Sequence, residues 1–448
     1  MQNEKKLFKR KIYDQMLRWK KESDGKTALL VKGAKRVGKS TIVEQFAKNE
    51  YKSFILINFA SAPQEVHELF SDISDLNYLF IRLQLIFHVD LHERNSVIIF
   101  DEVQQEKRAR QAIKFLVADH RYDYIETGSL ISIRKNIEGI SIPSEETRIQ
   151  MFPMDWEEFL WATGDVTTCP LLEKIYAQRI GLGNDVQRRI MRYFRLYMLV
   201  GGMPQAVQTY LETNNFRMVD QAKREILDLY EEDFMKIDPS GKAFLIFDNI
   251  PAQLTGNATR YQASSVLGNP KQEKFSEIVN EMAESMTVNI AFHATDPAVG
   301  LSLSKSLSHF KIFLADTGLF VTLAFKDKSF TENIIYEKLL NDKLDVNLGY
   351  LYENIVAQML KASGNELFYY TFPMENSTRS YEIDFLLSRG AKLCPIEVKS
   401  SGYKTHASLD AFSQKYASRI LQRYLIYPKD FAKEQDILCI PVYMTPFL

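Results

Sequence analysis

The sequence is poor in cysteine and has no long apolar run. Its three cysteines, Cys169, Cys394 and Cys439, are scattered and lack the spacing of metal ligands. They indicate small buried side chains in a reducing compartment, so we expect a cytoplasmic protein. No stretch approaches a run of about 18 consecutive apolar residues, which a membrane-spanning helix needs. The basic segment 5–11 is not followed by the apolar core of a signal peptide, and we expect no membrane partner.

Net charge is also nearly absent. The 448 residues include 56 Lys and Arg against 57 Asp and Glu, which leaves a formal net charge of -1. Such a chain has no overall attraction to nucleic acid or membrane, so any nucleic-acid contact must come from local patches. With 46% hydrophobic and 25% charged residues the composition is that of a soluble globular protein, and the length predicts two or three domains.

Residues 1–165 alternate short apolar runs with helical patterns. This alternation predicts an α/β fold in which helices cover both faces of a parallel sheet. Helices are expected to begin near Lys39, Asp75 and Ala109. Strands are expected at 28–32, 54–59, 97–101, 124–127 and 148–152.

Residues 166–330 show a different pattern. An amphipathic helix is expected over 186–199, and it stops at Gly201 and Gly202 before a new helix begins at Pro204. A long helix is expected over 216–235. Helices at 242–254 and 274–285, followed by short strands at 288–292 and 311–313, favour a winged-helix-like arrangement.

Residues 348–448 return to alternation, which predicts a second α/β domain. The charged and weakly periodic segment 326–347 is the expected hinge before it. Helices are expected at 349–360 and 407–416, and strands at 366–371, 381–387, 392–399, 420–427 and 437–443.

A glycine-rich segment links the first expected strand to the helix at Lys39. It follows the P-loop pattern G-x-x-x-x-G-K-[ST]. In this pattern, backbone N–H groups and a helix N-terminus hold phosphate oxygens. Lys39 would hold the β- and γ-phosphates of ATP, and the Ser40 hydroxyl would bind Mg²⁺. The alternative is an ordinary glycine-rich turn. The residues assigned to the nucleotide are Gly33, Ala34, Lys35, Arg36, Val37, Gly38, Lys39, Ser40 and Thr41.

A later apolar strand ends in two adjacent carboxylates, Asp101 and Glu102. We expect this strand to lie beside the P-loop strand, where Asp101 binds Mg²⁺ and Glu102 is the catalytic base that polarises the attacking water. Unpaired buried charge is costly, so packing does not explain the pair, although a solvent-facing strand end would. One strand separates the two elements in sequence, which fits the P-loop ATPases that insert a strand between the P-loop strand and the Mg²⁺ strand.

The next strand ends in polar residues. Thr127 and Ser129 are candidates for sensing the γ-phosphate or orienting the water, and a turn hydroxyl without such a role is the alternative. Arg148 and Arg195 are candidates for an arginine finger, and each is equally explained as a surface or lid residue.

The C-terminal segment contains a second group of charged residues. Asp384 lies in one expected strand, and Glu397 and Lys399 share a face of the next because side chains alternate along a strand. Two carboxylates that bind Mg²⁺, with an ammonium that steadies the attacking water, suit phosphodiester hydrolysis. Glu353, on the helix before them, is a candidate further metal ligand. A salt-bridged strand pair, with Lys399 against Asp384 or Glu397, explains the spacing equally well.

Together these motifs resemble a group of bacterial and archaeal AAA-type ATPases. Its members carry a C-terminal region of unknown function that is similar to PD-(D/E)xK nucleases, although Ile383 stands where the motif has proline. The resemblance implies four parts: a P-loop ATPase core at 1–165, a helical lid at 166–236, a winged-helix-like region at 237–330 and an α/β restriction-endonuclease-like domain at 348–448. The matching stretches are 30–41, 100–104, 127–129, 201–204, 314–319 and 381–400.

The leading hypothesis is an ATP-hydrolysing protein whose nucleotide cycle controls a nuclease-like, DNA-acting C-terminal module. The alternative is a nucleotide-gated switch whose C-terminal domain recognises a partner without cleaving it. AAA-type relatives often assemble as rings, so the resemblance raises a homo-oligomer, which no single residue determines. Candidate DNA contacts, each also explained as a solvated surface residue, are Arg260, Lys271, Lys274, Lys404 and Lys415.

Overall fold

The described part of the chain divides into two units of dense internal contacts, Met1–Phe152 and Pro153–Leu448. The computed structural model describes residues 7–128, 144–255, 260–268, 272–298, 300–327, 333–341, 349–375, 377–401 and 405–448. Within these ranges, no helix is long and apolar enough to cross a membrane.

A sheet of five strands forms the centre of the first unit, in the order β2-β3-β4-β1-β5. All neighbouring strands are parallel. The predicted parallel sheet is therefore confirmed, and each strand lies within two residues of its expected bounds. The strands are β1 (Ala28–Lys32), β2 (Ser53–Asn58), β3 (Ser96–Asp101), β4 (Asp123–Gly128) and β5 (Glu146–Gln150).

The order of these strands corrects one prediction. β4 lies between β1 and β3, so the prediction that the Asp101 strand lies beside the P-loop strand was wrong. Crossover connections let successive strands of a parallel sheet take places that are not adjacent, and the residue pattern of a strand does not encode its place. The strand inserted between β1 and β3 is β4, which follows both of these strands in the sequence. The strand expected there, β2, lies at the edge of the sheet.

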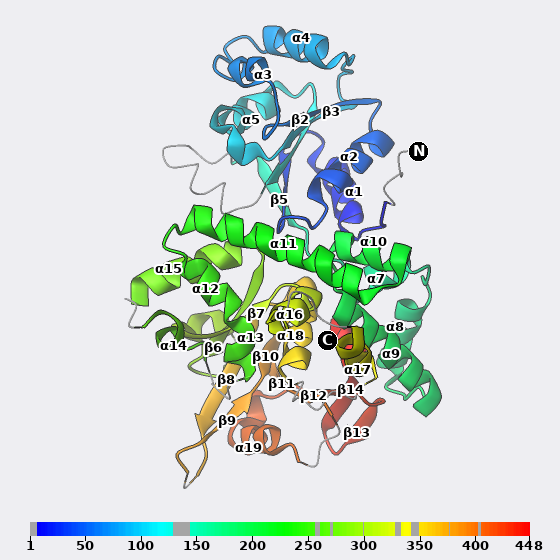
Figure 1. Cartoon of the computed structure of the whole chain (residues 1–448), viewed down its shortest axis with the longest axis vertical. Coiled ribbons are helices and arrows are strands. Elements are labelled where there is room, and N and C mark those ends of the chain that lie inside the picture. Colours follow the sequence, from blue (N-terminus) through cyan, green and yellow to red (C-terminus); the bar gives the residue numbers. More distant parts are fainter. Residues whose placement is uncertain are drawn as a thin grey trace. The chain divides into compact units, whose positions relative to one another are not determined.

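Helices cover both faces of this sheet, as Figure 1 shows. Side chains alternate along each strand, so Leu29 and Val31 join the core on one face and Leu30 joins the core on the other. The first face is covered by α1 (Ile12–Ser23) and α2 (Lys39–Glu50), and the second by α3 (Gln64–Leu69), α4 (Leu76–Phe87) and α5 (Lys107–Asp119). Because the strands are parallel, their carboxyl ends meet at one edge, where ligands of such sheets bind.

Helices also make up the first part of the second unit. The predicted helices beginning near 186, 204 and 216 are confirmed as α9 (Asn184–Val200), α10 (Pro204–Thr213) and α11 (Phe216–Ile237). The single helix expected at 242–254 was wrong, because α12 (Lys242–Asp248) ends before α13 (Ile250–Thr255) begins. Pro251 explains the break, since proline cannot donate the helical hydrogen bond and restricts the residue before it. The other helices are α7 (Trp156–Ala162), α8 (Thr168–Gln178), α14 (Ala263–Leu267), α15 (Gln272–Glu284), α16 (Thr317–Ala324), α17 (Asn333–Leu340), α18 (Gly349–Ala362) and α19 (Ala407–Tyr416).

The strands of the second unit form two sheets, ordered β7-β6-β8-β9 and β10-β11-β12-β14-β13. In the first, β6 (Val288–Ala294) pairs antiparallel with β7 (Lys305–Leu314) and parallel with β8 (Leu367–Pro373). The hairpin expected as a wing within 237–330 therefore shares a sheet with the C-terminal segment. A residue pattern predicts the two strands of a hairpin, but not which distant strand pairs with its open edge.

The chain passes from one sheet to the other at Asp384. The single strand expected at 381–387 consists of β9 (Ser380–Ile383), paired with β8, and β10 (Phe385–Arg389), paired with β11 (Lys392–Val398). α18 packs against strands of both sheets, so it holds this passage from one side. The remaining strands are β12 (Arg423–Tyr427), β13 (Ala432–Glu434) and β14 (Ile437–Pro441).

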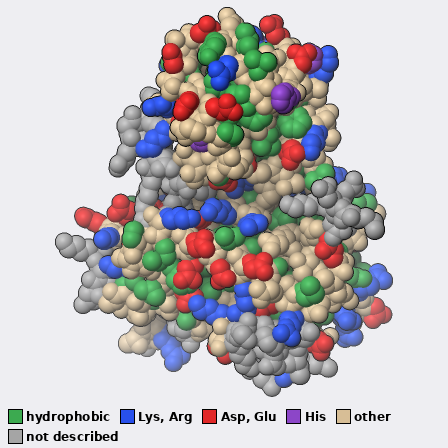
Figure 2. Space-filling view, turned by 45° about the horizontal axis from the view of Figure 1, so that its top comes forward, with side chains coloured by type: hydrophobic (Ala, Val, Ile, Leu, Met, Phe, Trp, Pro, Cys, Tyr) green, Lys and Arg blue, Asp and Glu red, His purple; other side chains and the backbone are tan. Residues whose placement is uncertain are grey.

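Charged side chains of both signs are interspersed on the face of the molecule in Figure 2. Lys and Arg side chains lie among Asp and Glu side chains there, as expected for a net charge of -1. Attraction of a charged ligand therefore depends on local groups rather than on the whole face.

Candidate functional site

The P-loop runs from the end of β1 to the start of α2. Gly33 passes close to the chain after β5, because a Cβ at Gly33 would lie 2.5 Å from the carbonyl oxygen of Met151. Gly38 has φ 101°, a left-handed conformation that favours glycine, and it immediately precedes α2. The two glycines of the motif thus meet a steric and a conformational demand of the loop.

The Lys39 ammonium lies over this loop. Its Nζ donates hydrogen bonds of 3.0 Å to the carbonyl oxygens of Gly33 and Ala34, and its side chain is buried. The lysine is therefore already at the loop whose backbone would surround phosphates. Of the other predicted loop residues, Val37 is buried, Lys35 and Ser40 are half-buried, and Arg36 and Thr41 are exposed.

Asp101 is the centre of the contacts beside the loop. Its Oδ1 accepts a hydrogen bond of 2.8 Å from Ser40 Oγ and another from the Thr127 hydroxyl, and its Oδ2 accepts one of 2.9 Å from Asn58 Nδ2. Asp101 is 2% exposed. The three donors, from α2, β4 and β2, hold the carboxylate at the carboxyl edge of the sheet.

Glu102 lies next to this group in a left-handed turn, with φ 54°. Its backbone N–H donates to Thr127 Oγ1 at 3.3 Å, and its Oε2 accepts a hydrogen bond from Gln104 Nε2. The side chain is half-buried. The Glu102 carboxylate is therefore held by Gln104, and the residue is partly open to solvent.

Two residues of this site were missed by sequence reasoning. Asn58 is the register partner of Asp101 in the β2–β3 pair, and a polar residue that ends a neighbouring strand was the signal for it. Arg10 donates to the carbonyl oxygens of Val37 at 3.0 Å and Phe152 at 2.6 Å, and so ties the loop to the chain after β5. A lone arginine in a basic segment carried no signal for that role.

Arg148, one of the two candidates for an arginine finger, is held in an ion pair. Arg148 pairs with Glu146 at 2.6 Å and is 47% exposed. Arg195 belongs to the second unit, on α9. Ser129 lies outside the described residues.

The predicted C-terminal residues gather around the passage between the two sheets. Asp384 Oδ2 accepts the backbone N–H of Val398 at 2.7 Å, so the carboxylate lies against the end of β11. Lys399 Nζ lies 2.5 Å from Glu397 Oε1, as the salt-bridge alternative predicted. Glu397 is 6% exposed, and its Oε2 has no hydrogen-bond partner among the described residues.

A lysine that the sequence did not indicate lies among these acids. Lys311, on β7, forms an ion pair with Glu382 and lies 3.5 Å from Glu353 Oε2. Burial by itself lowers the pKa of Lys311, but the carboxylates of Glu353, Glu382 and Asp384 raise it above its ordinary value. Glu353 therefore contacts a lysine here.

Negative charge is concentrated around Asp384. Burial, and then the charge on Glu353, raise the pKa of Asp384 well above its ordinary value, with further contributions from Glu382 and Glu397. Four carboxyl groups thus face the two ammonium groups of Lys311 and Lys399. Within the ranges that the structure describes, no three His, Cys, Asp or Glu side chains are arranged to hold a metal ion.

The candidate DNA contacts come from separate elements. Arg260 shares a hydrogen bond with His309, and Lys274 is exposed on α15. Lys415 of α19 lies over the rings of Phe372 and Tyr416, at 5.8 and 5.4 Å from their centroids. Lys271 and Lys404 lie outside the described residues.

Comparison with known families identifies the type of one domain of the chain. Residues 25–160 match a family described as an AAA domain. Residues 191–329 and 348–444 match two families described as domains of unknown function, DUF8612 and DUF4143. The AAA match includes the P-loop, Asp101 and Glu102, so the N-terminal part of the chain is an AAA-type P-loop ATPase domain.

The similarity to individual proteins named below is low. An uncharacterized protein of Methanocaldococcus jannaschii, MJ1637, is 23% identical over 312 residues, which cover 64% of this chain and 59% of that protein. The chain thus spans less than two thirds of that relative. Two solved structures are similar: the Walker-type ATPase PABY2304 of Pyrococcus abyssi (15% identity, TM-score 0.43, 71% of this chain and 96% of that chain) and the Holliday junction branch migration motor RuvB of Thermotoga maritima (11%, 0.29, 63% and 89%). Similarity this low transfers no function.

Proposed function

We propose that the protein binds ATP with Mg²⁺ at the P-loop and hydrolyses it. The observation that carries this proposal is the 2.8 Å contact between Ser40 Oγ and Asp101 Oδ1. Ser40 directly follows Lys39 in the sequence. A hydroxyl at the start of the P-loop helix and an acid at the end of another strand of the same sheet are the pair that holds Mg²⁺ in P-loop NTPases. Bound Mg²⁺ neutralises charge on the phosphates.

The loop fits a triphosphate. Gly33 leaves room for the chain at Met151, and Gly38 takes the left-handed conformation before α2, so the loop can turn its backbone N–H groups toward phosphate oxygens. The Lys39 ammonium donates to the carbonyl oxygens of Gly33 and Ala34, and charged phosphate oxygens attract an ammonium more strongly than neutral carbonyl oxygens do. The helix dipole of α2 adds to the same attraction.

Glu102 is the proposed base. Its carboxylate, held by Gln104, would accept a proton from the attacking water, and such a base contributes about 10²–10⁴-fold to a rate. Thr127 is assigned a positioning role, because its hydroxyl donates to Asp101 and it accepts the Glu102 backbone N–H. Sensing of the γ-phosphate or orientation of the water by this hydroxyl stays a prediction.

Two variants test the ATPase proposal. Lys39→Ala should abolish binding of a fluorescent ATP analogue, whereas Glu102→Gln should keep binding and lose at least about 100-fold in turnover. Lys48→Ala and Glu44→Gln, which alter an exposed ion pair on the same helix α2, are the matched controls and should match the wild type. Normal hydrolysis by Glu102→Gln would show that another residue is the base.

The second part of the proposal is that the nucleotide cycle controls a DNA-acting, nuclease-like site in the C-terminal region. Asp384 and Glu397 would hold Mg²⁺ there, and Lys399 would steady a water or the developing charge. The unpartnered, buried Glu397 Oε2 and the excess of carboxyl groups around Asp384 support a cation at this place. Two carboxylates suffice for Mg²⁺, which usually keeps several water ligands.

The alternative, a binding module that does not cleave, is favoured by a different observation. The Lys399–Glu397 ion pair and the position of Lys311 among Glu353 and Glu382 neutralise part of the acidic group from within the chain. In that case ATP binding would change the second unit, and the C-terminal domain would only recognise a partner.

Metal-dependent cleavage separates these two functions. The wild type and Asp384→Ala/Lys399→Ala should be compared on a panel of DNA substrates with Mg²⁺ or Mn²⁺, in each nucleotide state, while calorimetry measures Mn²⁺ binding. Asp327→Ala/Lys433→Ala removes the same two residue types at exposed positions and is the control. No cleavage by the wild type, together with unchanged DNA affinity and Mn²⁺ binding in the variant, would exclude the nuclease function.

A further inference from the structure

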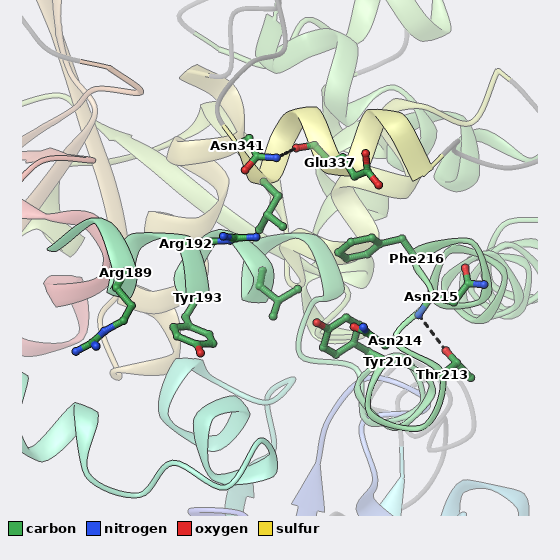
Figure 3. A pocket seen from close by; sticks show the side chains of 12 residues that line it. Arg189, Arg192, Tyr193, Tyr210, Thr213, Asn214, Asn215, Phe216, Glu337 and Asn341 are labelled. Carbon is green, nitrogen blue, oxygen red and sulfur yellow. Dashed lines mark hydrogen bonds between the residues drawn. The ribbon is translucent and has the colours of Figure 1, made fainter. Parts of the chain in front are cut away.

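A groove lies on the second unit, between α9, the turn from α10 to α11, and α17. Its volume is about 850 Å³. Figure 3 shows Arg189, Arg192 and Tyr193 extending from α9, with Phe216 and Tyr210 across from them. Neither the P-loop nor the carboxylate group around Asp384 contributes to its lining, so the groove is a separate place on the molecule.

The first relevant feature of the groove is unpaired positive charge. Arg189 and Arg192 lie one turn apart on α9 and both are exposed. Neither guanidinium forms a hydrogen bond or ion pair with the described part of the chain. Glu337 is the acid in the lining, so positive charge is in excess there. Two free guanidinium groups at this spacing suit an anion with repeated charges, such as a chain of phosphates.

The second feature is a wall of aromatic rings. Phe216 stacks on Tyr336 with ring centroids 5.0 Å apart and on Tyr210 with centroids 5.8 Å apart. Tyr336 is buried, so this stack is anchored in the core. Tyr193, beside the arginines, is 55% exposed. An exposed ring next to guanidinium groups offers a stacking surface to a flat, unpaired base.

The third feature is a polar turn at the end of the groove. Asn214, in a left-handed conformation with φ 47°, closes α10, and Asn215 caps the 22-residue helix α11. The first residues of α11 line the groove, so the positive end of its dipole lies there. Amide side chains can donate and accept hydrogen bonds, so this turn suits the edges of bases as well as phosphates.

We infer that this groove binds single-stranded nucleic acid. Phosphates would contact Arg189 and Arg192, and a base would stack on Tyr193, with the edge of the Phe216 stack as the facing wall. A duplex fits less well, because its bases are stacked on each other and their faces are not available to a tyrosine ring. The inference deepens the proposed action on DNA by naming a strand-binding surface, and it rests on that proposal only for its biological use, since binding is measured without cleavage.

Binding is tested on the full chain in EDTA, by fluorescence anisotropy of a labelled oligothymidylate. Arg189→Gln/Arg192→Gln should weaken binding at least about 10-fold and reduce the slope of log K against log salt by about 1.4, since each phosphate contact on a single strand contributes about 0.7. Tyr193→Ala should weaken binding about 5- to 100-fold with the salt slope unchanged, because stacking releases no counterions. Arg188→Gln, exposed on the same helix but outside the lining, is the matched control and should bind like the wild type.

Several outcomes would overturn the inference. Wild-type affinity in both groove variants would do so, as would equal affinity for a duplex of the same sequence. Displacement of the oligonucleotide by micromolar AMP would assign the groove to a mononucleotide, and displacement by polyglutamate would assign it to an acidic protein. If binding is lost in Asp384→Ala/Lys399→Ala but kept in the groove variants, the strand is bound at the C-terminal site, so the groove inference fails while the proposed function stands.

Discussion

The carboxylate of Asp316 accepts the backbone N–H of Gly202 at 2.6 Å, and so joins the start of α16 to the turn before α10. The other oxygen of Asp316 caps α16 by accepting the N–H of Leu319 at 2.9 Å. Asp316 is 1% exposed, and a buried carboxylate needs such partners. Two motifs of the sequence, at 201–204 and 314–319, are thus explained by one crossing of the backbone in the second unit.

The backbone at Gly318 passes close to Gly201, so we predict that replacing Gly318 by a larger residue destabilises the protein. A Cβ at Gly318 would lie 2.5 Å from the Cα of Gly201, so backbone would have to move. Gly318→Ala should destabilise the protein by about 1–3 kcal/mol, as overpacking does. Chemical unfolding measures this, with Gly164→Ala as the control, because a Cβ there meets nothing within 4 Å and only its positive φ costs stability. Equal losses for the two variants would contradict a steric role for Gly318.

The hydrogen bond from Asn58 to Asp101 predicts that removing the Asn58 side chain impairs metal binding rather than folding. Its Nδ2 holds Asp101 Oδ2 at 2.9 Å, and groups that orient metal ligands typically contribute about 10- to 100-fold in metal affinity or activity. Asn58→Ala should therefore raise the Mg²⁺ concentration needed for half-maximal ATP turnover by about that factor. Asn49→Ala, on the exposed side of α2, should leave this concentration unchanged. An unaltered Mg²⁺ dependence in Asn58→Ala would remove Asn58 from the site.

The position of Lys311 between Glu353 and Glu382 predicts that the stability of a variant without this lysine depends on divalent cations. Removing one partner of a buried ion pair costs about 3–5 kcal/mol, so Lys311→Met should lower the melting temperature markedly. A divalent cation can replace the lost charge between Glu353 and Glu382, so Mn²⁺ should stabilise this variant more than it stabilises the wild type. Lys305→Met changes a half-buried lysine of the same strand that lies over the ring of Phe292, and it should show no such recovery. The absence of any Mn²⁺ effect on Lys311→Met would show that the acids do not form a cation site.

Glu126 predicts a pH dependence of stability in the first unit. Burial raises the pKa of Glu126 from 4.5 to about 7, although Arg110 opposes this. Between these values the folded protein keeps a proton that the unfolded chain has lost, so the contribution of Glu126 to the free energy of unfolding falls as pH rises through that window. Glu126→Gln carries no charge at any pH, so its melting temperature should fall less than that of the wild type between about pH 5 and 7. Glu65→Gln, at an exposed position, should follow the wild type, and parallel curves for Glu126→Gln and the wild type would contradict the shift.

The prediction of the fold from sequence succeeded where the signal was local. The five strands of the first unit were expected because apolar runs alternate with helical patterns, and the helix at Lys39 because the P-loop places its start. Pro251 is a local signal that was available, and it accounts for the helix break that was not predicted. The passage between sheets at Asp384 was not predictable in this way, because which strand pairs with β9 and which with β10 is decided by distant segments.

The sequence by itself determined which residues stand next to one another in the proposed nucleotide site. Lys39 and Ser40 are adjacent in one loop, as are Asp101 and Glu102 at the end of one strand, so their chemistry follows from neighbouring residues. The tertiary structure alone decided which groups surround them. It placed β4 next to β1, brought Thr127 and Asn58 to Asp101, and brought Lys311 to Glu353. These partners are separated by many residues, and their meeting depends on strand order and helix packing, which are properties of the whole folded chain.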